Sequence, residues 1–144
     1  MKNILVGIDF DEKTEELIEK AVALAKKYKA KLWLLHAVPP LPEFVGFDAT
    51  PHYVTEGRAE EMEREQSRLD EYANKLKKEG VDSEGVLIQG TTISVILEES
   101  KNLNVDLIIC GHHEHNFLYN LIFGSVSAAI VRQSDIPVLV YPLG

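Results

Sequence analysis

The feature that most constrains the fold of this chain is the alternation of short apolar runs with longer segments of helical periodicity. Five apolar runs occur in 144 residues, at 4–8, 32–38, 86–88, 105–110 and 137–141. They are continuously apolar, which is typical of strands covered on both faces in a parallel sheet. Because strand and helix alternate from end to end, the pattern predicts an α/β domain with right-handed crossovers. No linker divides it, so we expect one domain, 1–144.

Four segments between these runs are predicted to be helices. The first has apolar residues at helical spacing from Leu17 to Tyr28, with Asp11 as its expected N-cap. The second, about 56–79, is heavily charged, and the third carries Ile93, Ile96, Leu97 and Leu103. The fourth carries Val126, Ala129 and Ile130. Residues 39–55 hold four of the six prolines and are predicted to form a long surface loop.

Charge and composition exclude some classes of binding partner and cellular location. The formal net charge is -8, from 15 basic and 23 acidic residues, which argues against nucleic acid or an anionic membrane as the main partner. The first apolar run is too short for a signal peptide or a membrane span, so we expect a cytoplasmic protein. The single cysteine, Cys110, ends an apolar run and is expected to be a buried small hydrophobe.

Candidate binding residues follow the strands. In open parallel sheets, ligands bind outside the carboxyl ends of the strands. Asp9 follows the first predicted strand, Val38 ends the second and Gly111 follows the fourth. Gly124-Ser125 opens the fourth helix, where backbone N–H groups and hydroxyls can face an anion. The alternative is that Gly124 is a turn residue and Ser125 an N-cap, with nothing bound.

Several of these segments together resemble one family. They are the first strand with Asp9, then 35–38, 105–111, 124–127 and 135–140. Over about residues 2–143 they resemble the universal stress protein family. That resemblance implies an open Rossmann-like sheet of five parallel strands, order 3-2-1-4-5, with helices on both faces. It also implies a homodimer through the last strand and an ATP or AMP site, with or without Mg²⁺, between the first and fourth strands.

The resemblance also assigns roles to individual residues. Asp9 would hold the ribose or the adenine edge. Ile8 and Val38 would supply apolar and main-chain contact to the base, and Gly111 would allow close approach. The phosphates would be bound by Gly124, Ser125, Val126 and Ser127. The implied function is a stress response or signalling role exerted through conformation and an unknown protein partner. We expect no enzyme activity beyond slow ATP hydrolysis, because the loop has no evident general base and no lysine or arginine.

One position departs from the family's nucleotide motif. That motif is Gly, two residues, Gly, nine residues, then Gly followed by Ser or Thr. Here Gly111 and Gly124-Ser125 keep the spacing, but Glu114 replaces the second glycine. A carboxylate about 5 Å from a phosphate charge costs about 3 kcal/mol at an effective dielectric near 20. Exposure of Glu114 to solvent, or a divalent metal between the two charges, would reduce that cost.

Two other functions are compatible with the sequence. The chain could be a nucleotide-free dimeric interaction module, in which the acidic second helix or the 39–55 loop meets a protein partner. Alternatively, His112, His113 and His115 with Glu114 could form a metal- or pH-responsive loop. Adjacent ligands in one loop rarely enclose a metal alone, so exposed histidines without a metal are the favoured interpretation. The chain has no Gly-x-x-x-x-Gly-Lys-Ser/Thr run and no Gly-x-Ser-x-Gly elbow.

Overall fold

The chain forms one parallel five-stranded sheet with helices on both faces. The computed structural model describes residues 1–40, 52–113 and 126–143. In these ranges the elements are, in order, β1 (Asn3–Gly7), α1 (Thr14–Tyr28), β2 (Lys31–Val38), α2 (His52–Lys78), β3 (Ser83–Gln89), α3 (Thr92–Asn102), β4 (Leu107–His113), α5 (Val126–Gln133) and β5 (Val138–Leu143). The strand order is β3-β2-β1-β4-β5, and the described pairs are parallel. The predicted fold class and strand order are confirmed.

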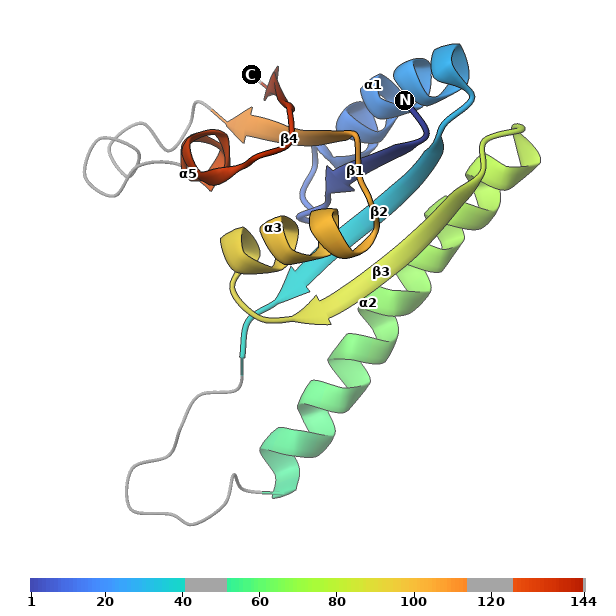
Figure 1. The fold of residues 1–144 in the computed structure, drawn as a ribbon. Helices are drawn as coiled ribbons and strands as arrows, with labels where there is room; N and C mark the ends of the chain where they lie inside the picture. The colour runs from blue at the N-terminus through green and yellow to red at the C-terminus, as the bar shows by residue number, and fades with distance from the viewer. Residues whose placement is uncertain (41–51, 114–125, 144) are drawn as a thin grey trace.

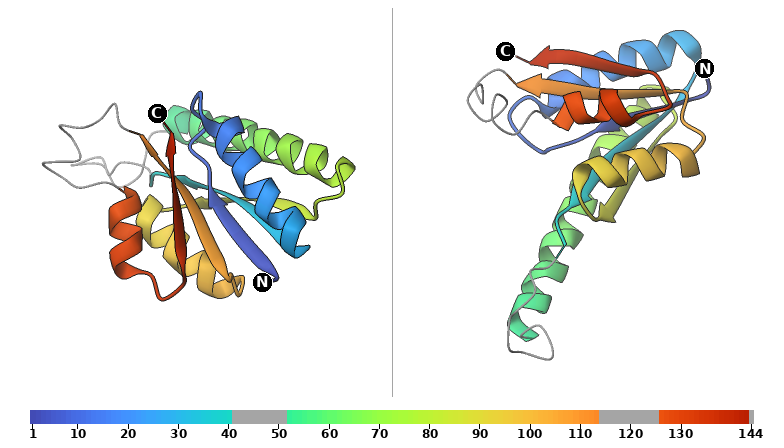
Figure 2. Two further views of the ribbon diagram at one scale, coloured as in Figure 1. Left: turned by 90° about the horizontal axis from the view of Figure 1, so that it is seen from above. Right: turned by 60° about the vertical axis from the view of Figure 1, so that its left-hand side comes forward.

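The helices divide into two layers, one on each side of the sheet. Helices α1 and α2 cover one face, while α3 and α5 cover the other (Figures 1 and 2). Each layer encloses its own apolar core: Leu17, Leu34 and Leu69 are buried in the first, and Leu35, Ile96 and Ile130 in the second. Burial on both sides explains why the strands are apolar without alternation.

The pleat of β2 sends neighbouring residues into opposite layers. Leu32 and Leu34 belong to the core under α1 and α2, whereas Leu35 belongs to the core under α3 and α5. His36 follows the first set, because its ring contacts α2. The alternation continues to the carboxyl end of the strand, so β2 presents side chains to both layers there.

Helix α2 is much longer than the strand on which it packs. Its 27 residues span about 40 Å at 1.5 Å per residue, whereas the seven residues of β3 span about 23 Å. The N-terminal part of α2 therefore extends beyond the sheet (Figure 1). Its C-terminal part lies close to β3, because a Cβ on Gly85 would stand only 2.6 Å from Leu69 Cβ.

Several element boundaries differ from the sequence predictions. Strand β3 begins three residues before the predicted run, and β4 continues to His113, so Gly111 lies within that strand instead of after it. Helix α2 begins at His52, so the last residues of the predicted 39–55 loop are helical; residues 41–51 lie outside the described ranges. Asp11 is not the N-cap of α1, since the cap position is Lys13. Its carboxylate instead accepts the Lys13 backbone N–H at 2.9 Å, which supports the turn that leads into the helix. Within the described ranges, no helix has the length and apolar character needed to cross a membrane.

Candidate functional site

A small cavity lies at the carboxyl ends of β1 and β4, on the face covered by α3 and α5. Its volume is about 50 Å³. The lining residues come from three strands and two helices: Gly7, Ile8, Asp9, Leu35, Ala37, Thr92, Ile96, Cys110, Gly111, Val126, Ser127 and Ile130. Since β1 lies between β2 and β4, the chain reverses direction across the sheet here, which is where open α/β sheets bind ligands.

Two helix N-termini open onto this cavity. Thr92 is the first residue of α3, and Val126 and Ser127 are the first two residues of α5. The first turn of a helix carries backbone N–H groups without intrahelical acceptors and the positive end of the helix dipole. Two such ends at one cavity favour a bound anion, and the hydroxyls of Thr92 and Ser127 add hydrogen-bonding groups.

The cavity wall next to the end of β1 carries a negative charge. Asp9 follows β1 and is exposed at the cavity. Its carboxylate influences Cys110 on β4: burial, and then the charge of Asp9, raise the pKa of that thiol to about 11. Cys110 is 6% exposed, so it is a neutral buried group, as its sequence context indicated. The cavity thus combines one carboxylate with two positive helix ends.

The structure brings together most of the predicted site residues that it describes. Ile8, Asp9, Gly111, Val126 and Ser127 all line the cavity. Val38 does not: its side chain is 1% exposed, and Ala37 lines the cavity in its place. The pleat accounts for this difference, because residues one apart point to opposite faces of a strand. Gly124 and Ser125 lie outside the described residues.

Thr92 is a lining residue that the sequence analysis missed. It follows Gly90-Thr91 directly after β3, and Thr91 occupies the N-cap position of α3. A glycine and two hydroxyl residues between a predicted strand and a predicted helix are a usable signal for a helix N-terminus near the ligand edge. That signal was available in the sequence. Only the proximity of α3 to α5 required the structure.

Gly111 is required by packing as well as by the cavity. A Cβ at this position would stand 2.4 Å from Leu143 Cδ1, and Leu143 on β5 is 2% exposed. The resemblance assigned Gly111 to close approach of a ligand. The structure adds a second reason for glycine here, which is the close approach of β5.

The turn after β1 is held from the opposite face of the sheet. Phe10 has a φ of 58°, a left-handed conformation that is unusual for a bulky residue. Its ring centroid lies 4.6 Å from that of His36, and the Arg68 guanidinium lies 4.4 Å above its ring. The Nδ1 atom of His36 lies 2.6 Å from the Ile8 carbonyl oxygen. Strained backbone of this kind persists where its surroundings hold it, which here are β2 and α2.

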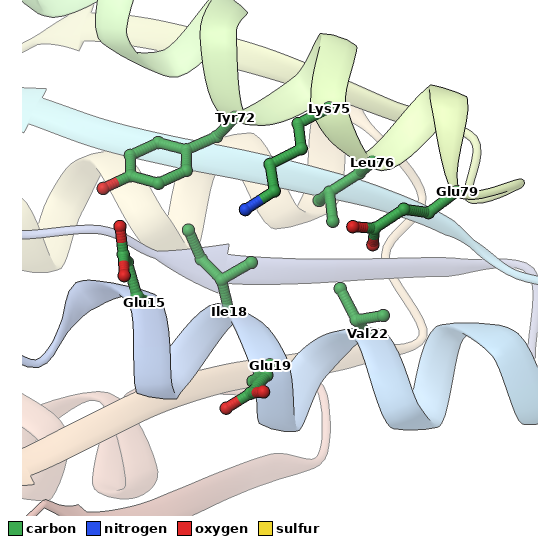
Figure 3. A pocket seen from close by; sticks show the side chains of 8 residues that line it. All are labelled: Glu15, Ile18, Glu19, Val22, Tyr72, Lys75, Leu76 and Glu79. Atoms are coloured by element: carbon green, nitrogen blue, oxygen red, sulfur yellow. The ribbon is translucent and has the colours of Figure 1, made fainter.

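A wider groove lies between α1 and α2, on the other face (Figure 3). It has a volume of about 270 Å³ and an apolar floor of Ile18, Val22 and Leu76. Its rim carries the carboxylates of Glu15, Glu19 and Glu79 with the ammonium group of Lys75, and the side chains of Tyr72 and Glu15 point toward one another across it (Figure 3). Three carboxylates against one ammonium group disfavour a phosphate ligand.

The residues of the predicted metal loop are only partly described. Glu114 and His115 lie outside the described residues. Among the residues that the structure describes, no group of three His, Cys, Asp or Glu side chains could hold a metal ion. His112 and His113 are the last two residues of β4 and pair with β5, so they do not lie in a loop as expected. The metal-responsive role stays a prediction.

Comparison with known proteins identifies relatives over nearly the whole chain. The model of the universal stress protein family matches residues 1–142. A universal stress protein of Helicobacter pylori is 33% identical over 139 residues, covering 96% of this chain and 98% of the relative. One solved universal stress protein, in complex with cAMP, has a TM-score of 0.74 at 22% identity and covers 98% of this chain and 96% of its own. Another, from Arabidopsis thaliana with AMP bound, has a TM-score of 0.66 at 18% identity, covering 100% and 93%.

Proposed function

Because the chain belongs to the universal stress protein family, we propose that it binds an adenine nucleotide, ATP or AMP, at the cavity between β1 and β4. The observation that carries this proposal is the meeting of two helix N-termini at the switch point of the sheet. Solved members of the same fold with bound AMP and cAMP support it. The cavity of about 50 Å³ is smaller than common ligand sites of about 300 Å³ or more. The described residues therefore form only part of the proposed site.

Each wall of the cavity has a separate role in this proposal. Asp9 accepts hydrogen bonds from the ribose hydroxyls or the adenine amino group. The N-terminal turn of α5 receives phosphate oxygens through backbone N–H groups and the Ser127 hydroxyl, and Thr92 supports them from α3. Ile8 and Ala37 provide apolar contact for the base. Asp9 lies toward the sugar and base, because a carboxylate against a phosphate would repel it.

We further propose that the bound nucleotide acts through conformation and partners, without rapid turnover. No lysine, arginine or histidine is among the described residues that line the cavity, and the Cys110 thiol is neutral because its pKa is raised to about 11. Phosphoryl transfer depends on cations that stabilise the transferring charge and on a group that positions the nucleophile. A stress response or signalling role of the bound state requires neither of these groups.

The test begins with the purified protein, which is denatured and examined for released adenine nucleotide. Calorimetric titration with ATP and AMP, with and without Mg²⁺, then measures affinity. Asp9→Asn should weaken binding by about tenfold, the equivalent of one charged hydrogen bond. Asp135→Asn, at an exposed residue paired with Lys101 and outside the cavity lining, is the matched control. Neither carried nucleotide nor binding at millimolar ligand would contradict the proposal.

The extension of α2 beyond the sheet favours a second candidate function, a nucleotide-free interaction module. Exposed charged side chains, among them Glu60, Glu63 and Arg64, cover this part of the helix. In this alternative, the protein partner binds along α2 and the cavity stays empty. The denaturation assay separates the two functions, since only the first predicts released nucleotide. Reversing the charge of Glu60 and Glu63 should then impair the cellular role while leaving the fold, measured by circular dichroism, unchanged.

A further inference from the structure

His36 joins the turn after β1 to helix α2. Its Nδ1 atom lies 2.6 Å from the Ile8 carbonyl oxygen, and its Nε2 atom lies 3.5 Å from Glu65 Oε2 on α2. Both side chains are largely buried, with 14% and 20% of their surfaces exposed. One imidazole therefore contacts the backbone that precedes Asp9 on one side and a carboxylate of the neighbouring layer on the other.

The hydrogen-bonding chemistry fixes the proton on Nδ1. A carbonyl oxygen can only accept, so the short contact to Ile8 requires that Nδ1 donate. In a neutral imidazole, Nε2 would then direct a lone pair at the Glu65 carboxylate, which is also an acceptor. The imidazolium form carries a proton on both nitrogens and satisfies both contacts. In the described part of the chain, the buried Glu65 Oε2 accepts no hydrogen bond, so a charged His36 is the group suited to compensate it.

The surroundings of His36 make this contact sensitive to charge. Helix α2 contributes Glu65 and also Arg68, which lies over the Phe10 ring that packs on His36. The turn contributes Asp9, next to Ile8, and β3 contributes Leu87 beside His36 in the sheet. A proton on Nε2 attracts Glu65, whereas its loss leaves two acceptors facing each other in a partly buried site.

We propose that His36 is a positioning residue that fixes the Ile8–Phe10 turn to α2 in a proton-dependent way, and thereby controls the nucleotide site through Asp9. The last step rests on the proposed function, whereas the attachment of the turn does not. With both nitrogens protonated, His36 holds the Ile8 carbonyl and α2 together. Loss of the Nε2 proton weakens the link to α2 and frees the turn, whose left-handed Phe10 is strained.

Two substitutions separate the two nitrogens. In His36→Asn the side-chain amide reaches the position of Nδ1, so it can still donate to the Ile8 carbonyl. In His36→Gln the amide reaches the position of Nε2 and loses that donor. Hydrogen exchange of the backbone amides of residues 8–10 measures the attachment of the turn without any nucleotide. We expect exchange to rise by up to about tenfold in His36→Gln, the loss of one hydrogen bond, and by less in His36→Asn. Equal exchange in the two variants and the wild type would overturn the proposal.

The dependence of amide protection on pH separates a proton-dependent role of His36 from a purely structural one, because a purely structural role would not depend on pH. Between about pH 5.5 and 8, the protection of the amides of residues 8–10, which is the intrinsic exchange rate divided by the measured rate at the same pH, should fall with rising pH in the wild type. It should stay constant in His36→Asn. Glu65→Gln, which removes the carboxylate, should flatten the profile, and Glu63→Gln, at a neighbouring exposed position, should not. An identical profile in the wild type and His36→Asn would exclude His36 as its source.

Nucleotide affinity measured over the same pH range distinguishes failure of this inference from failure of the proposed function. If the wild type binds ATP or AMP, affinity should fall as the protection of the turn amides falls, and His36→Asn should remove this dependence. If no nucleotide binds but the exchange profile holds, the positioning role stands and the proposed function fails. If nucleotide binds with an affinity independent of His36 and of pH, the positioning role fails and the proposed function stands.

Discussion

At the scale of single residues, Cys110 illustrates how position decides chemistry. Burial and the Asp9 carboxylate raise its pKa from 9.0 to about 11, so at pH 8 about one thiol in a thousand is ionised. We expect a thiol reagent to modify the folded protein at pH 8 about a hundredfold more slowly than the protein unfolded in urea. Asp9→Asn should raise the rate in the folded state, because it removes the second cause of the shift. Equal rates in folded and unfolded protein would contradict the burial of the thiol.

Glu114 is the residue on which the strength of nucleotide binding depends in our proposal. It replaces the second glycine of the family motif and lies outside the described residues. If its carboxylate faces the phosphates, Glu114→Gly should tighten ATP binding by up to about a hundredfold, the equivalent of about 3 kcal/mol. Glu114→Gln keeps the Cβ and removes the charge, so calorimetry on both variants separates repulsion from backbone conformation. Unchanged affinity in both would mean that the carboxylate points away.

At the scale of elements, Asp106 joins the start of β1 to β4. Its Oδ2 atom accepts the backbone N–H groups of Lys2 at 2.7 Å and Asn3 at 2.9 Å. The hydrogen bonds from Asn3 and then Lys2 are the main causes that lower its pKa below 3.8. Since the folded pKa is depressed, the stabilisation is present above about pH 4 and is lost as pH falls through the folded pKa. Asp106→Ala should lower the melting temperature at pH 7, and this difference should shrink toward pH 3. A difference that is constant with pH would contradict the role.

The close contact between α2 and β3 requires glycine, the residue without a side chain, at position 85. A Cβ on Gly85 would lie 2.6 Å from Leu69 Cβ and 3.1 Å from the Leu69 carbonyl carbon, which is backbone and cannot rotate away. We expect Gly85→Ala to destabilise the protein by about 2 kcal/mol through overpacking, measured by urea denaturation. Gly57→Ala, in the same helix layer with no atom within 4 Å of the added Cβ, should stabilise α2 by up to about 1 kcal/mol. Equal effects of the two substitutions would contradict the close contact.

The elements were predictable from the sequence because their signals are local. Continuous apolar runs and helical spacing depend on neighbouring residues, so the strands and helices were found with boundary errors of a few positions. The features that could not be predicted depend on how the elements lie relative to one another. Asp106 accepts from residues more than 100 positions away, and the buried position of Val38 depends on the pleat at the end of β2. The role of Thr92 likewise depends on the proximity of α3 and α5.

At the scale of the whole molecule, the open edge of β5 is the feature that bears on assembly. In the described sheet β5 pairs with β4 on one side and is the last strand, and an open strand edge is a natural place for pairing with another chain. We propose a homodimer through this strand and expect light scattering to give twice the mass of one chain. Val140→Arg should shift the mass toward one chain, whereas Tyr28→Arg, at an exposed residue of α1, should not. A monomeric wild type would contradict the proposed interface.

The placement of the cavity and of His36 on opposite faces of one sheet has a mechanical consequence. Leu35 and Ala37 line the cavity on one side, while His36, between them, contacts α2 on the other. A shift of β2 along its own axis would therefore move the cavity wall and the imidazole together. Only the single layer of the sheet separates the two sites. A protein bound to the outer end of α2 would therefore respond to occupancy of the cavity without contacting it.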